Sequence, residues 1–448
     1  MPRQAAGPAD NLLTYLDQAS FLGLRATGLE QLAQWVWVYE RAVELAGLER
    51  FRHHLGHGLF GRLIERSPLP FGRHRWVTAP DSPAIDVAER IRPRAELGDW
   101  ADEQAQLPID PERGPGWRLA VQRFEDGATA VTVVASHCLV DGLAGGRAIA
   151  DAANGVDHDF GYSPPRSRPL LAAVRSDARQ VLHDLPEVVK AIAAMARLAR
   201  GGQQELARLG GAQPIAACPA DGNVVVPAIT IQLEAGQWDA RAAELGGTSN
   251  ALLNAIAAKA GVRLGRQRPD GGVSLRFVVS DRGEHDTRAN ALSFVTIDVD
   301  PTQVTRELAE VRVAIKEALA TLGGAPDESL AVLPVTPWTP QWAVRRMAEA
   351  MFTDFSVGCS NLREVDPATG RPDGTDADWF AARGVTQHIT RTVLERIQGQ
   401  VTLASGRFRD HVFLTVVAYD VHGDNTKRAL RELMKDTLAE FELVGTVD

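Results

Sequence analysis

Apolar and polar residues follow two different periods along this chain, and the changes between them mark the expected strands and helices. In the range 117–135, WRLAVQRF alternates apolar and polar residues, Glu-Asp-Gly at 125–127 is a turn signal, and AVTVVA follows as an apolar run. The pattern predicts a β-hairpin with a buried second strand. A short helix is expected over about 143–153, because the Asn-Gly pair at 154–155 is typical of a helix end.

The second half of the chain repeats this mixture of patterns. A helix is expected at 249–264, since its apolar residues recur every three to four positions on one face. Further strands are predicted at about 228–233, 273–279, 291–300, 355–360 and 411–419, and further helices at 306–322 and 425–441. Because strands and helices mix in both halves, the expected fold class is α/β (α+β), with two lobes that each contain a mixed sheet flanked by helices.

The range 156–225 differs from its surroundings in composition. It is Pro-rich, then Ala- and Arg-rich, then Gly-rich, and it contains one run with helical spacing, LPEVVKAIAAMARLAR. A chain of 448 residues is also longer than a single core usually supports. We therefore expect an N-terminal lobe at 1–165, a helical connection at 166–223 and a C-terminal lobe at 224–448.

Composition narrows the classes of function. The hydrophobic content of 45% and the charged content of 23% are typical of a globular protein, and no run approaches the roughly 18 apolar residues of a membrane span. The net charge of -9 argues against a nucleic-acid partner. The start of the chain lacks the apolar core of a secretory signal, and three scattered cysteines fit neither a disulfide framework nor a zinc site. These features predict a cytoplasmic protein.

The run SHCLVDG at 136–142, directly after the predicted buried strand, contains the residues suited to catalysis. A histidine at the end of a rigid strand is suited to general-base chemistry, because its pKa lies near neutrality. Asp141 can fix the loop that carries His137, and Gly142 permits a close backbone approach. A core histidine packed at a strand end would give the same short pattern, so this pattern alone leaves both interpretations open.

With this H-x-x-x-D-G pattern, the chain resembles the superfamily of thioester-dependent acyltransferases that carry an HxxxDG or HHxxxDG motif. That superfamily includes wax ester synthase/diacylglycerol acyltransferases, condensation domains of nonribosomal peptide synthetases and plant BAHD acyltransferases. The bacterial wax ester synthase/diacylglycerol acyltransferase branch is the most similar. The similar segments, in matching order, are LLTYLDQASFL, GGTSNALLNAIAAKAGVRLG, VSLRFVV, NALSFVTIDVDP and FSVGCSNLREVDP.

The resemblance implies two chloramphenicol-acetyltransferase-like lobes with a tunnel between them, in which donor and acceptor meet at His137. His137 matches the motif histidine, which takes a proton from the acceptor hydroxyl or amine. Asp141 and Gly142 match the rest of the motif and support the catalytic loop. In the family this aspartate pairs with an arginine on a strand of the second lobe, and the resemblance assigns that role to Arg276 in VSLRF.

Three further residues are expected at the tunnel. Ser136 stands where many family members carry a first histidine, although members with the shorter motif work without it. Asn290 and Ser293 belong to the Asn-x-x-Ser strand of the resemblance, where they would contact the tunnel or donate to an oxyanion. Packing between the lobes is the other interpretation of these two residues.

The resemblance also implies the co-substrates. No permanently bound cofactor and no metal are expected. The donor is acyl-CoA, or an acyl group on the phosphopantetheine of a carrier protein, and the acceptor is a long-chain alcohol or a diacylglycerol-like lipid. The run around 188–199 fits peripheral attachment to the inner face of a membrane, and a helix that only connects the lobes explains it equally well. Two alternatives are a free-standing condensation-type enzyme of secondary metabolism, which uses a carrier-bound donor, and a catalytically silent scaffold with the same fold.

Two other patterns stay open. The range 50–75 contains six arginines and one acid, which fits either a docking surface for an anionic donor or an ordinary solvated helix face followed by a loop. His53 and His57 lie one helical turn apart but have no evident third ligand, so we expect no metal site there. Cys138, inside the motif, is expected in the core rather than as a nucleophile.

Overall fold

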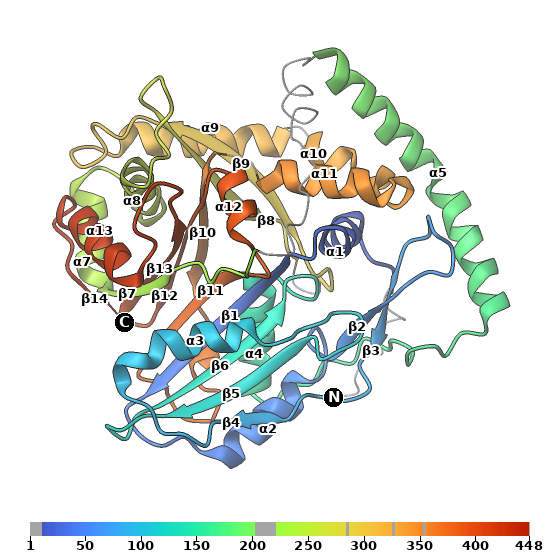
Figure 1. Ribbon diagram of the computed structural model, residues 1–448, viewed down its shortest axis with the longest axis horizontal. Helices are drawn as coiled ribbons and strands as arrows, with labels where there is room; N and C mark the ends of the chain where they lie inside the picture. Colours follow the sequence, from blue (N-terminus) through green and yellow to red (C-terminus); the bar gives the residue numbers. More distant parts are fainter. Residues whose placement is uncertain (1–10, 202–220, 284–285, 325–327, 353–354, 448) are drawn as a thin grey trace.

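The computed structural model describes residues 11–201, 221–283, 286–324, 328–352 and 355–447. These residues form two lobes, each a mixed β-sheet flanked by helices (Figure 1). The predicted fold class is therefore confirmed. None of the described helices is both long and apolar enough to cross a membrane.

The first lobe contains a five-stranded sheet in the order β11-β1-β6-β5-β4, in which β4 pairs parallel to β5 and the other neighbours are antiparallel. A separate hairpin pairs β2 with β3. The elements of this part of the chain are α1 (Tyr15–Thr27), β1 (Glu30–Tyr39), α2 (Leu45–Leu55), β2 (Arg62–Glu65), β3 (Arg75–Thr78), β4 (Ile85–Val87), η1 (Arg94–Glu96), α3 (Leu97–Gln106), β5 (Trp117–Arg123), β6 (Thr129–Ser136), α4 (Gly142–Ala153) and α5 (Leu170–Gly201).

Helices cover both faces of the first sheet, and the alternation along β1 decides which residues face which helix. Trp35 and Trp37 lie in one apolar cluster with residues of α2 and α4. Val36 and Val38 lie in another with Trp100 of α3. Successive side chains of a strand point to opposite faces, so a strand buried on both sides is apolar at almost every position, as WVWVY is.

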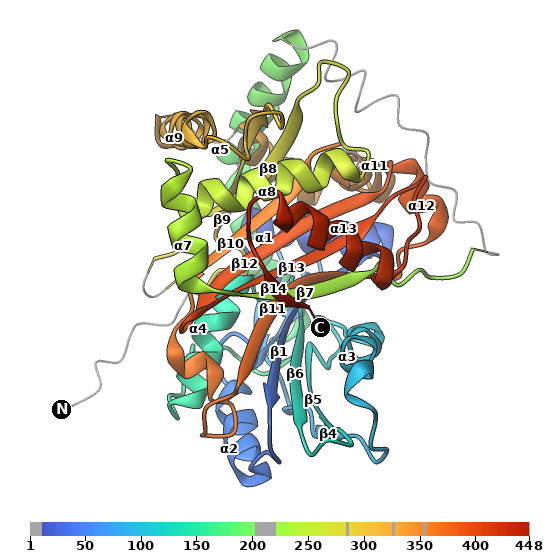
Figure 2. The same cartoon turned by 90° about the vertical axis from the view of Figure 1, so that its left-hand side faces the viewer.

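The second lobe contains a seven-stranded sheet in the order β14-β7-β13-β12-β10-β8-β9. Figure 2 shows α8 and α13 lying across one face of this sheet, and the two helices share the largest apolar cluster with its strands. The elements are β7 (Ala228–Glu234), α7 (Ala235–Glu244), α8 (Ser249–Arg263), β8 (Val273–Ser280), β9 (Leu292–Val299), α9 (Ala309–Gly324), α10 (Glu328–Ala331), η2 (Leu333–Trp338), α11 (Gln341–Phe352), β10 (Val357–Glu364), η3 (Pro367–Gly370), β11 (Trp379–Gln387), α12 (Arg391–Arg396), β12 (Gln400–Phe408), β13 (His411–Tyr419), α13 (Lys427–Ala439) and β14 (Gly445–Val447).

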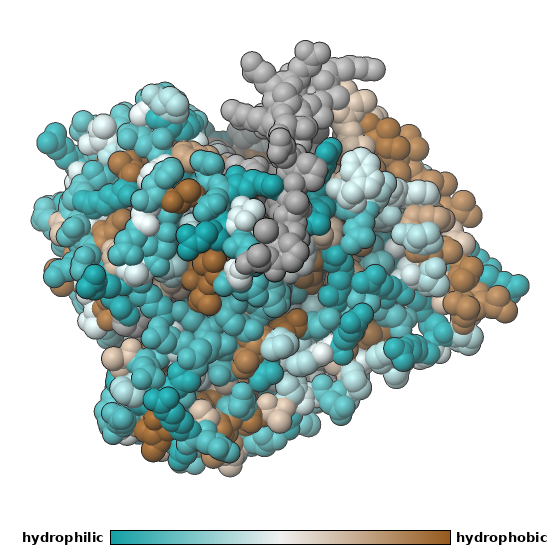
Figure 3. Space-filling model, in the orientation of Figure 1, coloured by the Kyte–Doolittle hydropathy of each residue, from teal (hydrophilic) through white to brown (hydrophobic). Residues whose placement is uncertain are grey.

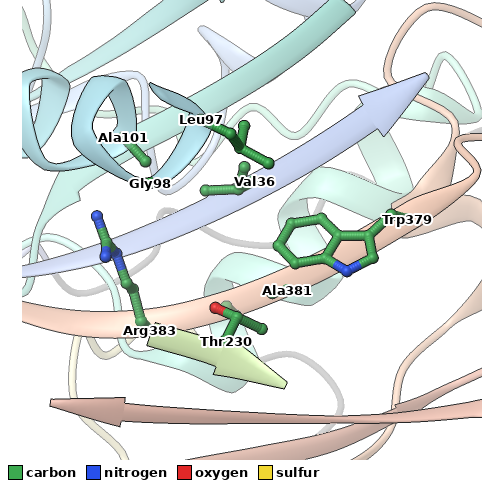
Figure 4. A pocket seen from close by; sticks show the side chains of 9 residues that line it. Val36, Leu97, Gly98, Ala101, Thr230, Trp379, Ala381 and Arg383 are labelled. Atoms are coloured by element: carbon green, nitrogen blue, oxygen red, sulfur yellow. The ribbon is translucent and has the colours of Figure 1, made fainter. Parts of the chain in front are cut away.

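Strand β11 connects the two lobes, because it belongs by sequence to the second half but forms an edge of the first sheet beside β1. The predicted boundary at residue 224 therefore does not separate the lobes completely. Arg383 on β11 donates to Gln34 of β1 at 2.7 Å and pairs with Asp102 of α3 at 2.7 Å. Figure 4 shows Arg383 beside a small cavity, with room for about one water molecule, that Trp379 and Thr230 also line.

Most locally predicted elements are confirmed. The hairpin at 117–135 is β5 and β6, the helix after it is α4, and the helix at 249–264 is α8. The helical run in the connection is part of a longer helix, α5, and residues 202–220 of the connection lie outside the described residues.

Candidate active site

His137 lies in the turn between β6 and α4, where it is half-buried. Its backbone N–H donates to the carbonyl of Gln31 on the neighbouring strand at 2.8 Å. Ser136 holds the same turn from inside, since its Oγ accepts from the N–H of Cys138 at 3.2 Å. The catalytic candidate is therefore attached to the rigid end of the first sheet.

Asn290 fixes the imidazole of His137. The Asn290 Oδ1 lies 2.8 Å from His137 Nδ1, while its Nδ2 donates to the His137 carbonyl at 3.1 Å and to Asp17 Oδ1 at 3.2 Å. Both partners of Nδ2 are pure acceptors, which sets the orientation of the amide and leaves Oδ1 to accept from the ring. Nδ1 therefore carries the proton, and Nε2 of the neutral ring has the free lone pair that a general base needs.

This arrangement changes the role expected for Asn290. Both amide hydrogens of Asn290 already have acceptors, so neither remains to donate to an oxyanion. Asn290 is a positioning residue for His137 instead. Ser293 lies on β9 opposite Val279 and is half-buried, and its predicted contact with a tunnel or an oxyanion stays a prediction.

Asp17 holds Asn290 from the opposite side. This carboxylate on α1 is fully buried and also accepts from the backbone N–H groups of Asn290 at 2.9 Å and Ala289 at 3.2 Å. Burial raises the pKa of Asp17, while the charge of Arg62 and the donors from Asn290 oppose that rise. A chain of side chains, Asp17 to Asn290 to His137, thus connects α1 to the His137 imidazole.

Asp141 begins α4 and fastens the loop that precedes β9. Its Oδ1 caps the helix by accepting from Ala144 N at 2.8 Å, and its Oδ2 accepts from Ala291 N at 3.2 Å. Its own N–H donates to the Ala289 carbonyl at 2.9 Å. One carboxylate therefore satisfies donors from both lobes.

The arginine that pairs with Asp141 is Arg282, with Nη2 at 2.6 Å from Oδ2, and not Arg276 as predicted. Arg282 lies just beyond the end of β8, and both side chains of the pair are buried. Arg276 lies inside β8, with its guanidinium over the Phe294 ring at 4.3 Å. The difference has a physical cause. The loop after β8 brings the side chain of Arg282 back to the motif, whereas the side chain of Arg276, inside the strand, points to a fixed face of the sheet.

Arg62 is a second buried cation in this region. It donates to the carbonyls of Leu139 at 2.8 Å and Thr287 at 2.6 Å, and its guanidinium lies 3.7 Å from the centre of the Trp76 ring. It therefore links the motif turn to the same loop that Arg282 and Asp141 hold. Such a buried arginine is stabilised by its two carbonyls, by the ring face and by the charge of Asp17.

Gly142 and Cys138 play packing roles. Gly142 is the first residue of α4, and a Cβ there would lie 3.0 Å from Leu362 of β10, so the small residue permits close contact between the lobes rather than an unusual backbone conformation. Cys138 is buried and burial raises the pKa of its thiol, which keeps it protonated and supports its predicted place in the core.

Ser136 stands where many members of the resembling family carry a first histidine, but its hydroxyl is already hydrogen-bonded inside the protein. Its Oγ donates to Glu30 Oε1 at 2.6 Å, and both residues are buried. Desolvation by burial raises the pKa of Glu30 to about 7, although the Ser136 hydrogen bond and the charge of Arg25 lower it. A carboxyl group that titrates near neutrality therefore lies beside the motif, and its partner Ser136 is a structural contact of the turn.

The cationic stretch at 50–75 is largely used inside the molecule. Arg73 and Arg75 pair with Asp184 and Asp177 of α5 at 3.6 and 3.2 Å, and Arg66 pairs with Glu112 at 2.7 Å. With Arg62 buried as well, these arginines attach α5 and the motif turn. Four of the six arginines in this range are therefore engaged within the molecule, which weakens its interpretation as a docking surface for an anionic donor.

Sequence reasoning missed Asp17, Arg62, Arg282 and Glu30. A signal existed for Asp17, which lies in the LLTYLDQASFL segment of the resemblance, and for Arg62, which belongs to the arginine-rich range 50–75. Arg282 and Glu30 carried none that distinguishes them from ordinary charged residues. Asp17 and Asn290 are separated by 273 residues in sequence, so only the fold brings them together.

Comparison with known proteins gives similarity of fold without close sequence similarity. No protein-family model and no curated protein sequence matches the chain. The wax ester synthase/diacylglycerol acyltransferase from Marinobacter aquaeolei VT8 matches with a TM-score of 0.54 and 15% identity, over 96% of this chain and 98% of that one. The first condensation domain of the calcium-dependent antibiotic synthetase, bound to a substrate analogue, matches with a TM-score of 0.57 and 12% identity, over 97% and 96%.

A third solved structure, polyketide synthase associated protein 5 from Mycobacterium tuberculosis, matches with a TM-score of 0.51 and 13% identity, over 96% of both chains. All three matches extend over both lobes, so the likeness is to the complete two-lobed arrangement. The chain therefore shares the two-lobed fold of these three structures.

Proposed function

We propose that this protein is an acyltransferase in which His137 deprotonates an acceptor that attacks an acyl thioester. The observation that carries the proposal is the fixed tautomer of His137, whose Nδ1 proton is held by Asn290 and whose Nε2 is left as a base. A histidine retained only for packing needs no such arrangement. The fold similarity to acyltransferases and condensation domains supports the same reaction class.

The proposed reaction has two proton transfers, both at Nε2 of His137. The acceptor hydroxyl approaches Nε2 and loses its proton as its oxygen bonds to the thioester carbon. The imidazolium that forms keeps its Nδ1–H bond to Asn290, so the ring does not turn during transfer. Nε2 then returns the proton to the departing thiolate, and the products are an ester and a thiol. No acyl-enzyme is required because the thioester is already activated, and proximity of two bound substrates supplies much of the rate.

The acceptor class that we propose is a long-chain alcohol or a diacylglycerol-like lipid, with acyl-CoA as donor. Helix α5 supports a lipid acceptor, because Leu171, Leu182 and Val189 lie on one face of it and are 77%, 67% and 64% exposed. Figure 3 shows apolar surface along this helix, at the outer edge of the molecule. Exposed Arg175, Arg179 and Lys190 also lie on the helix, and an apolar stripe with cations beside it fits the surface of an anionic membrane.

Thiol release from a panel of acyl-CoAs, measured with alcohol, diacylglycerol and amine acceptors, tests the proposal. We expect release that depends on both the donor and an alcohol or lipid acceptor, with the ester identified by mass spectrometry. Release only from acyl groups on a carrier protein would favour the condensation-type alternative. No release from either donor class with any acceptor would leave the silent scaffold as the account.

A further inference from the structure

Three metal-ligating side chains from two separate segments meet on the surface of the first lobe. His53 lies in the last turn of α2, His57 lies just beyond the end of this helix, and Asp157 lies beyond the end of α4. One ligand atom from each lies within 4.8 Å of those from the other two. We propose that these three residues bind a divalent transition metal ion, with Zn²⁺ as the best match, and that water completes its coordination. Two imidazoles and one carboxylate are the donor set that zinc accepts with an open fourth position.

The neighbouring hydrogen bonds hold the ligands close to one another. His57 Nδ1 lies 2.8 Å from the carbonyl of His53, and the two rings are 5.0 Å apart between centroids. Asp157 is held by His54, whose Nδ1 lies 2.7 Å from Asp157 Oδ1. A ligating carboxylate that is oriented by a second hydrogen bond is the usual arrangement at protein metal sites.

Closing the site requires only side-chain motion. Bonds of about 2.0–2.2 Å at a tetrahedral ion place the ligand atoms roughly 3.3–3.6 Å apart, so atoms within 4.8 Å of one another need to approach by about 1 Å. His53, His57 and Asp157 are all exposed, and rotation about their side-chain bonds meets little packing resistance. Mg²⁺ is a poor match because it prefers oxygen ligands in octahedral geometry.

The site joins two elements that are distant in sequence, because Asp157 follows His54 by 103 residues. Helices α2 and α4 already share an apolar cluster through residues such as Phe51 and Ile149. A bound ion would link α2 to the segment that follows α4. The N-terminus of α4 is capped by Asp141 of the motif. Metal binding therefore stabilises the helical layer that supports the motif and takes no part in the proton transfer.

Zinc titration of the untagged, EDTA-treated protein by calorimetry at pH 7.5, paired with thermal unfolding, tests this site. We expect one ion per chain, a rise of a few degrees in the unfolding temperature, and no response to Mg²⁺. His57→Ala and Asp157→Asn should each weaken zinc binding more than tenfold, and His54→Ala should weaken it about 10-fold. His411→Ala is the matched control, because His411 is an exposed histidine beside Asp410 on β13 of the other lobe, and it should leave binding unchanged.

Absence of stoichiometric zinc binding to the wild-type protein would overturn the proposal. Binding that survives in the triple variant His53→Ala, His57→Ala, Asp157→Asn would overturn it equally, since the ion would then be bound elsewhere. Circular dichroism of each variant establishes that the fold is retained before binding is compared.

Discussion

The polar cluster around the motif and the outer face of α5 distribute their residues in opposite ways. Around the motif, the carboxylates of Asp17 and Asp141 and the guanidiniums of Arg62 and Arg282 are buried together. On α5, large apolar side chains such as Leu182 are exposed, while Asp177 and Asp184 face inward to arginines. Each arrangement reverses the usual preference of charge for water and of apolar surface for the core.

The two reversals have different consequences. Burying charges costs free energy unless every group finds a partner, and such clusters fix geometry more than they add stability. In the cluster around the motif, the buried Asp17 holds Asn290, which in turn holds the His137 imidazole in one tautomer. Exposed apolar surface costs little in the folded chain but favours a partner that covers it. The first region is therefore expected to respond to mutation in stability and catalysis, and the second in binding.

Breaking the buried pair should have the largest effect on stability. Arg282→Ala leaves Asp141 buried without its partner, and we expect the free energy of unfolding to fall by about 3–5 kcal/mol in urea denaturation. Arg276→Ala is the matched control, because it removes an arginine only six positions away in sequence that contacts a ring at a half-exposed site. That variant should lose about 1 kcal/mol or less. Equal losses in the two variants would contradict the assignment of Arg282.

Removing the Asn290 oxygen that accepts from His137 Nδ1 should affect catalysis more than stability. Asn290→Ala frees the Nδ1 proton, and we expect kcat to fall by about 100-fold with a small change in KM. Asn290→Asp keeps an acceptor for Nδ1 but loses both Nδ2 donor contacts and puts a second carboxylate beside Asp17, so it should not recover that loss. Asn361→Ala is the control, since Asn361 bonds to Asn250 through its Nδ2 at 3.1 Å. A loss in KM alone, with kcat unchanged, would show that Asn290 contacts substrate instead.

Glu30 should make stability depend on pH. Its folded-state pKa of about 7 lies above the ordinary value of 4.5, so the folded chain keeps a proton that the unfolded chain releases between those values. Stability from this group is present below pH 4.5 and falls as pH rises towards 7, by about 1–3 kcal/mol. Glu30→Gln should flatten this part of the profile in denaturation at pH 5 and pH 7.5. Identical slopes in wild type and variant would contradict the raised pKa.

Charging the exposed face of α5 should have the smallest effect on stability. The double variant Leu182→Glu, Val189→Glu should change the free energy of unfolding by less than about 0.5 kcal/mol but abolish co-sedimentation with anionic vesicles. Val444→Glu, at a residue that is 78% exposed in the other lobe, is the matched control and should still co-sediment. If the wild-type protein does not bind vesicles, or the double variant binds as well as the control, α5 is not the membrane contact.

Local patterns predicted much of the fold. The hairpin of β5 and β6 and the helix α8 are encoded by alternation, turn residues and helical spacing within a few residues, and sequence shows these directly. The edge position of β11 in the first sheet was not predicted, because a strand's own residues do not say which sheet it joins. Its pairing with β1 connects residues more than 300 positions apart.

The site was predicted in part for the same reason. The run at 136–142 identified His137, Asp141 and Gly142, since the motif is contiguous. The partner of Asp141 was misassigned to Arg276, because the sequence does not show where β8 ends and its loop turns back to Arg282. The tautomer of His137 depends on Asp17 and Asn290, which come from opposite halves of the chain.

The central claim is that His137 is the base in acyl transfer. Its most direct test is acceptor-dependent thiol release at saturating donor and acceptor, compared between the wild-type protein and a folded His137→Ala variant. The account predicts that kcat falls by about 10²–10⁴-fold while the free energy of unfolding changes little. Release that continues in the variant at the wild-type rate would contradict it and would place the catalytic base elsewhere in the molecule.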